Sequence, residues 1–348
     1  TSARFLTAML AVRDGGEYTL DGDEAMRRRP IQKLADTLVQ LGCEIDTTNG
    51  FFPIRIRPRG LSGKSAQVDA TESSQFVSAL LMAAPLAQND IEIVLSNPSI
   101  RRGYIDLTLK MMQSFGIAAE KLIPSDSSYR IGTSPYQAPT NGYLIESDAS
   151  AASYFMALPL ATGGTVEIEG LTQNSMQGDI AFAQIAESAG ASLDWTSNSL
   201  VVSFDRSRLQ LRSLSENYYA YSDTFMTGAA IAPLAHGVTR IDGIAHTRHQ
   251  ECDRIAAMVD GLNRAGQNTS DEPAALEITP GPLNSATIDT FEDHRIAMSF
   301  AILGCHNALG NGKPWMQISD PLCCLKTFPE YFDVLESARQ QSIENFKM

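Results

Sequence analysis

A unit made of a strand, a loop and a helix recurs along this chain, and the recurrence limits the possible folds more than any other feature of the sequence. Four copies begin at positions 15, 89, 163 and 236. The helix of each copy ends at a glycine, and these are Gly42, Gly116, Gly190 and Gly266. A glycine in this position is typical of a helix C-terminus. The intervals of 74, 74 and 76 residues between the glycines are longer than a solenoid repeat, so we expect whole supersecondary units.

Each unit continues through one or two strands into a second helix that is apolar on nearly all sides. These second helices are predicted in the sequences FVSALLMAAPLA, AASYFMALPLA, FMTGAAIAPLA and RIAMSFAILG. A helix without a polar face belongs in the centre of a domain. Polar residues at 73–75, 148–150, 222–224 and 292–294 precede the helices, and the simplest role for them is N-capping.

The chain begins part-way through a repeat. Residues 1–4 lead directly into FLTAMLAV, which has the pattern of a second helix, and no initiator methionine comes before it. We therefore expect that residues preceding Thr1 have been lost and that four and a half units of a larger set remain.

Length and charge narrow the possible functions. A chain of 348 residues favours two domains. The formal net charge of −13 argues against sequence-independent binding of nucleic acid or anionic lipid, because both need a basic face. No membrane span or secretory leader is visible, and five cysteines do not suggest a disulfide framework, so a cytoplasmic protein is expected. Local arginine clusters at 27–29, 55–59 and 101–102 could still bind a small anion.

The loop of the fourth unit is rich in polar side chains. It contains His246, Arg248, His249, Gln250, Glu251 and Arg254. Spaced three residues apart, His246, His249 and Cys252 could surround a metal ion if the loop wrapped around it. No fourth ligand is nearby, and Cys252 should lie on the buried approach to the helix that begins at Asp253 and Arg254. We therefore expect no metal site.

Several short motifs follow one another along the chain. They are Arg29-Pro30, Ser73-Ser74-Gln75-Phe76, Tyr104-Ile105-Asp106, Asn174-Ser175-Met176-Gln177-Gly178-Asp179, Arg248 with Glu251 and Asp253-Arg254, Asp293-His294-Arg295, and Lys326-Thr327-Phe328-Pro329. In this order the chain resembles the 5-enolpyruvylshikimate-3-phosphate (EPSP) synthase family, also called the 3-phosphoshikimate 1-carboxyvinyltransferases. Each motif is weak alone, but together they cover nearly the whole chain.

The resemblance implies a fold and a reaction. The fold is α+β, with repeated βαβαββ units that form two pseudo-threefold domains, and here the first unit and the initial strand would be missing. Residues 1–144 would be the remainder of the first domain and residues 145–348 the second domain. The family transfers the enolpyruvyl group of phosphoenolpyruvate to the 5-hydroxyl of shikimate 3-phosphate and releases phosphate. No cofactor is implied, and a monomer is expected.

The resemblance also implies which residues contact the two substrates. Phosphoenolpyruvate would be bound by cations, namely Arg29, Arg254, Arg295 and Lys326. Shikimate 3-phosphate would be bound by Ser73, Ser74 and Tyr104, with Gln75 between the two ligands. The two serines fit a second role equally well, because a serine that caps a helix and a serine that binds phosphate there use the same geometry.

Two carboxylates match the family's proposed proton-transfer groups. Asp223 corresponds to the base for the 5-hydroxyl, and Glu251 corresponds to the acidic residue that serves the methylene carbon. Asp223 also precedes a predicted helix, so an N-capping role is open for it as well. His294, between Asp293 and Arg295, is expected to organise the site rather than to act as a nucleophile.

Three positions depart from the family's pattern. Gln250 occupies the place of a lysine that contacts substrate, His246 replaces an asparagine, and Arg101 replaces a serine that binds the substrate phosphate. Arginine can bind phosphate at least as well as serine does. Glutamine can donate a hydrogen bond, but it has no charge and no proton to transfer.

These departures and the missing start leave rival functions open. The family's lysine-serine pair and one arginine that binds substrate would lie before Thr1, so we expect negligible synthase activity from this stretch alone. One rival is an enolpyruvyl transferase with another acceptor, either a UDP-sugar or another cyclitol. The SSQF, DHR and KTFP motifs argue against the UDP-sugar. A second rival, supported by Gln250, is a catalytically inactive relative that only binds ligand.

Overall fold

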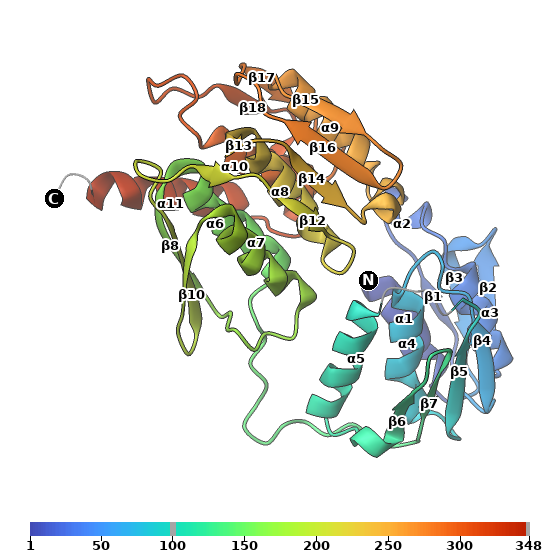
Figure 1. Ribbon diagram of the computed structural model, residues 1–348. Helices are drawn as coiled ribbons and strands as arrows, with labels where there is room; N and C mark the ends of the chain where they lie inside the picture. Colours follow the sequence, from blue (N-terminus) through green and yellow to red (C-terminus); the bar gives the residue numbers. More distant parts are fainter. Residues whose placement is uncertain (98–101, 346–348) are drawn as a thin grey trace. The chain divides into compact units, whose positions relative to one another are not determined.

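The computed structural model describes residues 1–97 and 102–345, and the chain forms two compact units, Thr1–Ile145 and Glu146–Met348 (Figure 1). Each unit has its own hydrophobic core. Arg101, one of the residues expected to bind phosphate, lies outside the described residues.

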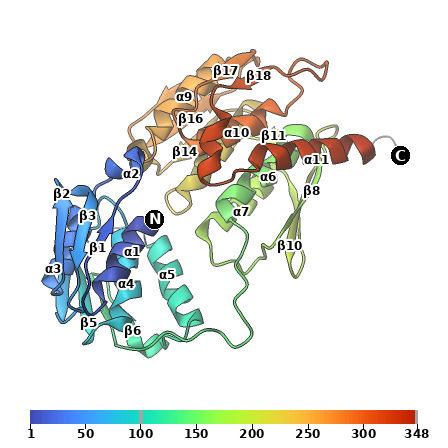
Figure 2. The ribbon, with the colours of Figure 1, turned by 180° about the vertical axis from the view of Figure 1, so that it is seen from behind.

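The first unit packs helices against two small sheets. Its helices are α1 (Ser2–Ala11), α2 (Glu24–Arg27), α3 (Gln32–Gln40), α4 (Gln75–Ala83) and α5 (Gly103–Ser114). Its strands are β1 (Tyr18–Leu20), β2 (Glu44–Thr48), β3 (Phe51–Arg57), β4 (Ser65–Val68), β5 (Ile91–Leu95), β6 (Leu122–Pro124) and β7 (Ser128–Ile131). Helix α4 packs between α1 and α5 (Figures 1 and 2). This position suits α4, because seven of its nine residues are buried.

The second unit repeats this plan with more elements. Its helices are α6 (Ala149–Thr162), α7 (Phe182–Ala189), α8 (Phe225–Ile231), α9 (Arg254–Arg264), α10 (His294–Gly304) and α11 (Tyr331–Asn345). Its strands are β8 (Gly164–Glu169), β9 (Ser192–Trp195), β10 (Ser199–Phe204), β11 (Leu211–Arg212), β12 (Ser215–Asn217), β13 (Ala235–His236), β14 (Thr239–Asp242), β15 (Asn268–Asp271), β16 (Ala275–Thr279), β17 (Ala286–Ile288) and β18 (Met316–Ile318). Short 3₁₀ turns at Gly178–Ala181, Ser222–Thr224, Ala245–His249 and Pro321–Lys326 carry residues discussed below.

The sequence repeat is visible in the order of the strands. The sheet β4-β5-β7-β6 has the same order and the same directions as β12-β14-β16-β15, with one parallel pair followed by two antiparallel pairs. The antiparallel sheets β1-β3-β2 and β8-β10-β9 also match each other. The predicted α+β fold built from repeated units is therefore confirmed at the level of the sheets.

The apolar second helices lie in the centre of the second unit, as the sequence predicted. Helices α6, α8 and α10 contact one another pairwise, and all seven residues of α8 are buried. No helix in the described ranges is long and apolar enough to cross a membrane. All five cysteines lie within those ranges and are free thiols.

The four glycines that were predicted to end helices all have left-handed backbone conformations. Their φ angles are +101° for Gly42, +86° for Gly116, +119° for Gly190 and +92° for Gly266. Gly190 ends α7, and its N–H reaches the carbonyl groups of Ala186 and Glu187. A side chain at a positive φ brings Cβ too close to the neighbouring carbonyl group, which is why glycine is needed here.

We predict that Gly190→Ala lowers the free energy of unfolding by about 1–2 kcal/mol. An alanine at this position would have to adopt a φ of +119°. Its Cβ would lie 3.2 Å from Cε2 of Phe204. Urea unfolding measures the change. Gly178→Ala is the matched control, because its φ is not positive and its Cβ would meet nothing closer than 3.5 Å. Equal effects of the two substitutions would contradict the conformational argument.

Candidate active site

The centre of the candidate site in the second unit is the guanidinium group of Arg254, which is 1% exposed. Its Nε donates to Asp293 at 2.8 Å, its Nη1 donates to Asp223 at 3.0 Å, and its Nη2 donates to Glu251 at 2.8 Å. Burial alone would lower the pKa of Arg254, but the nearby charges of Asp293 and Asp223 outweigh burial and raise it. Arg254 therefore stays charged in the interior and draws three carboxylates around itself.

The position of Arg254 follows from how helix α9 begins. Asp253 caps the helix by accepting a hydrogen bond from the N–H of Ala256 at 3.0 Å. Arg248 holds Asp253 in turn, through two bonds of 3.1 and 3.0 Å, and it also contacts Asp271 on β15. The sequence assigns no site role to Arg248. In the structure, its contacts with Asp253 and Asp271 connect this loop to strand β15.

Asp223 is not the N-cap residue of the helix that follows it. Thr224 occupies the N-cap position of α8 and makes no capping bond with its side chain. The carboxylate of Asp223 instead accepts hydrogen bonds from Arg254 and, at 3.0 Å, from Nη2 of Arg295. Asp223 therefore lies one residue before the N-cap position of α8 and contacts two arginines.

Asp293 both caps a helix and binds Arg254. Its Oδ1 caps α10 by accepting from the N–H of Arg295 at 2.8 Å, while its Oδ2 accepts from Arg254. Asp293 is fully buried. One carboxylate therefore fixes the start of a helix and the orientation of the central cation.

Lys326 completes the group of charges. Its Nζ lies 3.4 Å from Glu251, so two cations contact that carboxylate. We call the set the Arg254 cluster, and it consists of three cations and three carboxylates, namely Arg254, Arg295, Lys326, Asp223, Glu251 and Asp293. Five of these residues are among the predicted site residues, and Asp293 belongs to the Asp293-His294-Arg295 motif.

His294 is buried beside this cluster and is neutral near pH 7. Burial, followed by the charge of Arg295, lowers the pKa of His294 to about 4. A neutral imidazole has no imidazolium proton to give up near pH 7, although its remaining N–H can still donate a hydrogen bond. Its burial is compatible with an organising role, and that role of His294 stays a prediction.

The two departures that lie in the described residues have clear partners. His246 Nε2 is 2.8 Å from the hydroxyl oxygen of Ser222, and its ring packs edge-on against Tyr219. The amide oxygen of Gln250 accepts a hydrogen bond from Nη1 of Arg254. A lysine side chain has only donors and could not accept this bond.

Asp179 lies next to the cluster and was not selected from the sequence as a site residue. It is 7% exposed and accepts a hydrogen bond from Ser150. Burial, together with the charge of Asp223, raises the pKa of Asp179 to about 6. The sequence signal was the final residue of the NSMQGD motif, but only the structure shows that this carboxyl group faces Asp223.

A second group of predicted residues meets at the start of α4 in the first unit. Ser73 accepts a hydrogen bond from the N–H of Gln75 at 3.2 Å, and Ser74 is buried without capping the helix. Arg4 donates to both Ser73 and Gln75. The sequence did not single out Arg4, although an arginine in an apolar helix was an available signal.

The other two residues predicted in the first unit lie on neighbouring elements. Tyr104 is in the first turn of α5 and is 45% exposed. Arg29 is half-buried in the segment after α2, and its charge contributes to a lowered pKa of Arg4, for which burial is the larger cause. Arg29 and Arg4 therefore build a local positive potential.

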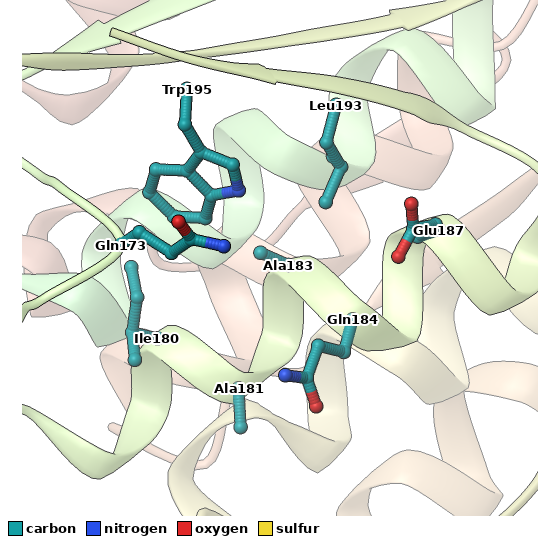
Figure 3. A pocket seen from close by; sticks show the side chains of 8 residues that line it. All are labelled: Gln173, Ile180, Ala181, Ala183, Gln184, Glu187, Leu193 and Trp195. Atoms are coloured by element: carbon teal, nitrogen blue, oxygen red, sulfur yellow. The ribbon is translucent and has the colours of Figure 1, made fainter.

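The described residues contain no group of three or more His, Cys, Asp or Glu side chains that could hold a metal ion. Cys252 faces Asp293 instead, and burial with the charge of Asp293 raises the pKa of Cys252 to about 12. A separate hollow of about 310 Å³ lies in the second unit. Figure 3 shows the side chains that line it, among them Gln184, Glu187 and Trp195. None of the predicted site residues lines this hollow.

Comparison with known proteins gives one family. The model of the family described as "EPSP synthase (3-phosphoshikimate 1-carboxyvinyltransferase)" matches residues 1–335. A 3-phosphoshikimate 1-carboxyvinyltransferase from Opitutus terrae is 44% identical over 348 residues, which cover 99% of this chain and 76% of that protein. A chloroplastic relative from Petunia hybrida is 40% identical over 97% of this chain and 66% of its own length. The chain thus spans about two thirds to three quarters of these relatives.

A solved structure shows the same fold. An EPSP synthase from Acinetobacter baumannii superposes with a TM-score of 0.76 at 23% identity, covering 97% of this chain and 76% of that one. The similarity supports the fold predicted from the repeat.

We predict that the stability of Asp179→Asn relative to the natural protein depends on pH. The folded pKa is about 6 and the ordinary value is 3.8, so the folded state retains a proton that the unfolded state loses between these values. The natural protein therefore loses stability as the pH rises from about 4 to 6, and the variant does not. The difference in unfolding free energy should grow by about 2 kcal/mol between pH 4 and pH 7.

Urea unfolding at several pH values measures this difference. Asp205→Asn is the control, because hydrogen bonding by Ser207 lowers the pKa of Asp205 and places its own effect below pH 3.8. A difference for Asp179→Asn that stays flat from pH 4 to pH 7 would show that the burial argument is wrong.

Proposed function

Because this chain belongs to the EPSP synthase (3-phosphoshikimate 1-carboxyvinyltransferase) family, we propose that it transfers the enolpyruvyl group of phosphoenolpyruvate to the 5-hydroxyl of shikimate 3-phosphate. Phosphate is the second product. The observation that carries this proposal is the Arg254 cluster, in which three cations suited to a small anion contact three carboxylates. Two of those carboxylates, Asp223 and Glu251, have side chains that are 20% and 18% exposed, so they can meet a ligand.

The chemistry has two stages. In the addition, the 5-oxygen of the acceptor bonds to C2 of phosphoenolpyruvate, its proton passes to a base, and the methylene carbon C3 gains a proton. In the elimination, the bond from C2 to the phosphate oxygen breaks and C3 returns a proton, so the double bond forms again. Asp223 takes the role of the base for the 5-hydroxyl, and Glu251 gives and recovers the proton at C3.

Substrate binding and proton transfer use the same ion pairs. Each of the three cations in the cluster contacts a carboxylate: Arg254 and Arg295 contact Asp223, and Lys326 contacts Glu251. An incoming carboxylate or phosphate group competes for those N–H groups. A carboxylate that loses a neighbouring cation becomes a stronger base. Binding of phosphoenolpyruvate therefore prepares the groups that move protons.

The acceptor is assigned to the first unit. Ser73, Ser74 and Tyr104 take the 3-phosphate of the shikimate ring, and Gln75 follows the two serines in the chain. Arg29 adds positive charge to the first unit. The monomeric state and the cytoplasmic location expected from the sequence stay predictions.

One rival function has a specific observation in its favour. Gln250, where the family has a lysine, accepts a hydrogen bond from Arg254 and so occupies one of its donors. A relative that binds ligand without turnover is therefore the alternative, and so is a transferase for another cyclitol.

Calorimetry and phosphate-release assays on the full-length protein, with a set of acceptors, test the assignment. Shikimate 3-phosphate, shikimate and UDP-N-acetylglucosamine are each measured with and without phosphoenolpyruvate. We expect shikimate 3-phosphate to bind, phosphoenolpyruvate to bind more tightly in its presence, and phosphate to be released. Tight binding without phosphate release would favour the inactive relative. Failure to bind shikimate 3-phosphate would exclude the proposed function.

We predict that Asp223→Asn and Glu251→Gln each lower kcat by about 10²- to 10⁴-fold, because each removes a proton-transfer group while keeping its shape. The affinity for phosphoenolpyruvate should change much less, since the cations remain. Glu187→Gln is the matched control, because Glu187 is an exposed carboxylate that lines the separate hollow. If both variants turned over at the rate of this control, Asp223 and Glu251 would not be the proton-transfer groups.

A further inference from the structure

Arg4 is a buried cation in the first turn of α1, next to the predicted phosphate-binding serines. It is 7% exposed, and its guanidinium carbon lies 4.9 Å from the centre of the Phe76 ring. Its Nη1 donates to the hydroxyl oxygen of Ser73 at 3.1 Å and to the amide oxygen of Gln75 at 3.0 Å. Its Nη2 donates to the carbonyl oxygen of Pro30 at 3.2 Å. Arg4 therefore joins α1, α4 and the segment before α3.

The acceptors around Arg4 are all neutral. In the described part of the chain no carboxylate lies within ion-pair distance of Arg4, and the nearby Glu72 is paired with Lys33 at 3.0 Å. Burial, together with the charge of Arg29, lowers the pKa of Arg4 to about 10, so it remains charged near pH 7. Burying a charge without an ionic partner is strongly unfavourable. An apolar side chain would fill the same space without that cost, which indicates that the charge has a use.

The hydrogen bonds that Arg4 donates indicate how its charge affects Ser73 and Gln75. Arginine has only donors, so every partner of Arg4 must present an oxygen to it. The oxygen of Ser73 accepts from Arg4 and also from the N–H of Gln75, which occupies both of its lone pairs. Its O–H can then act only as a donor, and the described residues offer it no acceptor. The amide oxygen of Gln75 is likewise fixed toward Arg4, which turns its NH₂ group away.

We propose that Arg4 is a positioning residue that makes Ser73 and Gln75 obligate hydrogen-bond donors toward the phosphate of the acceptor. One N–H of Gln75 contacts the hydroxyl of Thr1 at 2.9 Å, and its second N–H is left to donate. A site made of donors favours a fully ionised phosphate ester, which only accepts, over a neutral hydroxyl group. This inference rests on the proposed function, since it explains how the first unit distinguishes shikimate 3-phosphate from shikimate.

The test compares the binding of these two compounds by calorimetry. Arg4→Met should weaken the binding of shikimate 3-phosphate by about 10- to 100-fold, whereas shikimate should bind within about threefold of its original affinity. The ratio of the affinity for shikimate 3-phosphate to the affinity for shikimate, which we call the phosphate selectivity, therefore falls. Arg4→Lys keeps the charge but lacks the planar fork that serves three acceptors, so we expect its selectivity to fall as well.

Controls separate this effect from simple loss of structure. Thr7→Val removes the bond from the Thr7 hydroxyl to the carbonyl oxygen of Ala3 on the same helix, and it should leave the selectivity unchanged. Equal weakening of both compounds in Arg4→Met would overturn the proposal in favour of a purely structural role. If Arg4→Met does not fold, Arg4→Lys decides: unchanged selectivity in that variant overturns the proposal. If the natural protein fails to bind shikimate 3-phosphate, it is the proposed function that fails.

Discussion

A buried guanidinium group is the constraint on which the candidate site of the second unit depends. Arg254 begins helix α9 and is almost fully enclosed, yet it keeps its charge because three carboxylates contact it. An arginine in the interior without these partners would be strongly destabilising. Asp293 therefore serves stability as well as function, since it caps α10 and orients Arg254. The two other cations of the cluster pair with its carboxylates: Arg295 contacts Asp223, and Lys326 contacts Glu251.

Much of the fold could be predicted from the sequence because its main determinants are local. The helix-ending glycines have positive φ angles wherever the repeat placed them, and the helices without a polar face are buried in the centre. Both properties follow from backbone sterics and from hydrophobic periodicity, which short stretches of sequence contain. The pairing of strands into sheets of matching order needed the structure, because partner strands such as β12 and β14 are far apart in the sequence.

The candidate site was predictable in its residues but not in its contacts. The motifs identified Asp223, Glu251 and Arg254, but capping and ion pairing use the same residue types at a helix start, and only geometry separates them. Asp293 is the N-cap residue of its helix, whereas Thr224 rather than Asp223 has that position in α8. Arg4 and Asp179 were missed because their importance comes from burial and from partners in other repeats. A single sequence shows neither.

The distribution of the cluster over the repeats has a consequence for how the second unit folds. Asp223 and Arg295 are separated by 72 residues, and Arg254 and Asp293 by 39. Contacts between such distant residues form only after long loops have closed. A partly assembled unit that buried Arg254 before its carboxylates arrived would carry an unmatched charge. The ion pairs of the cluster can therefore form only after the segments that carry Asp223, Arg254, Asp293 and Lys326 have come together.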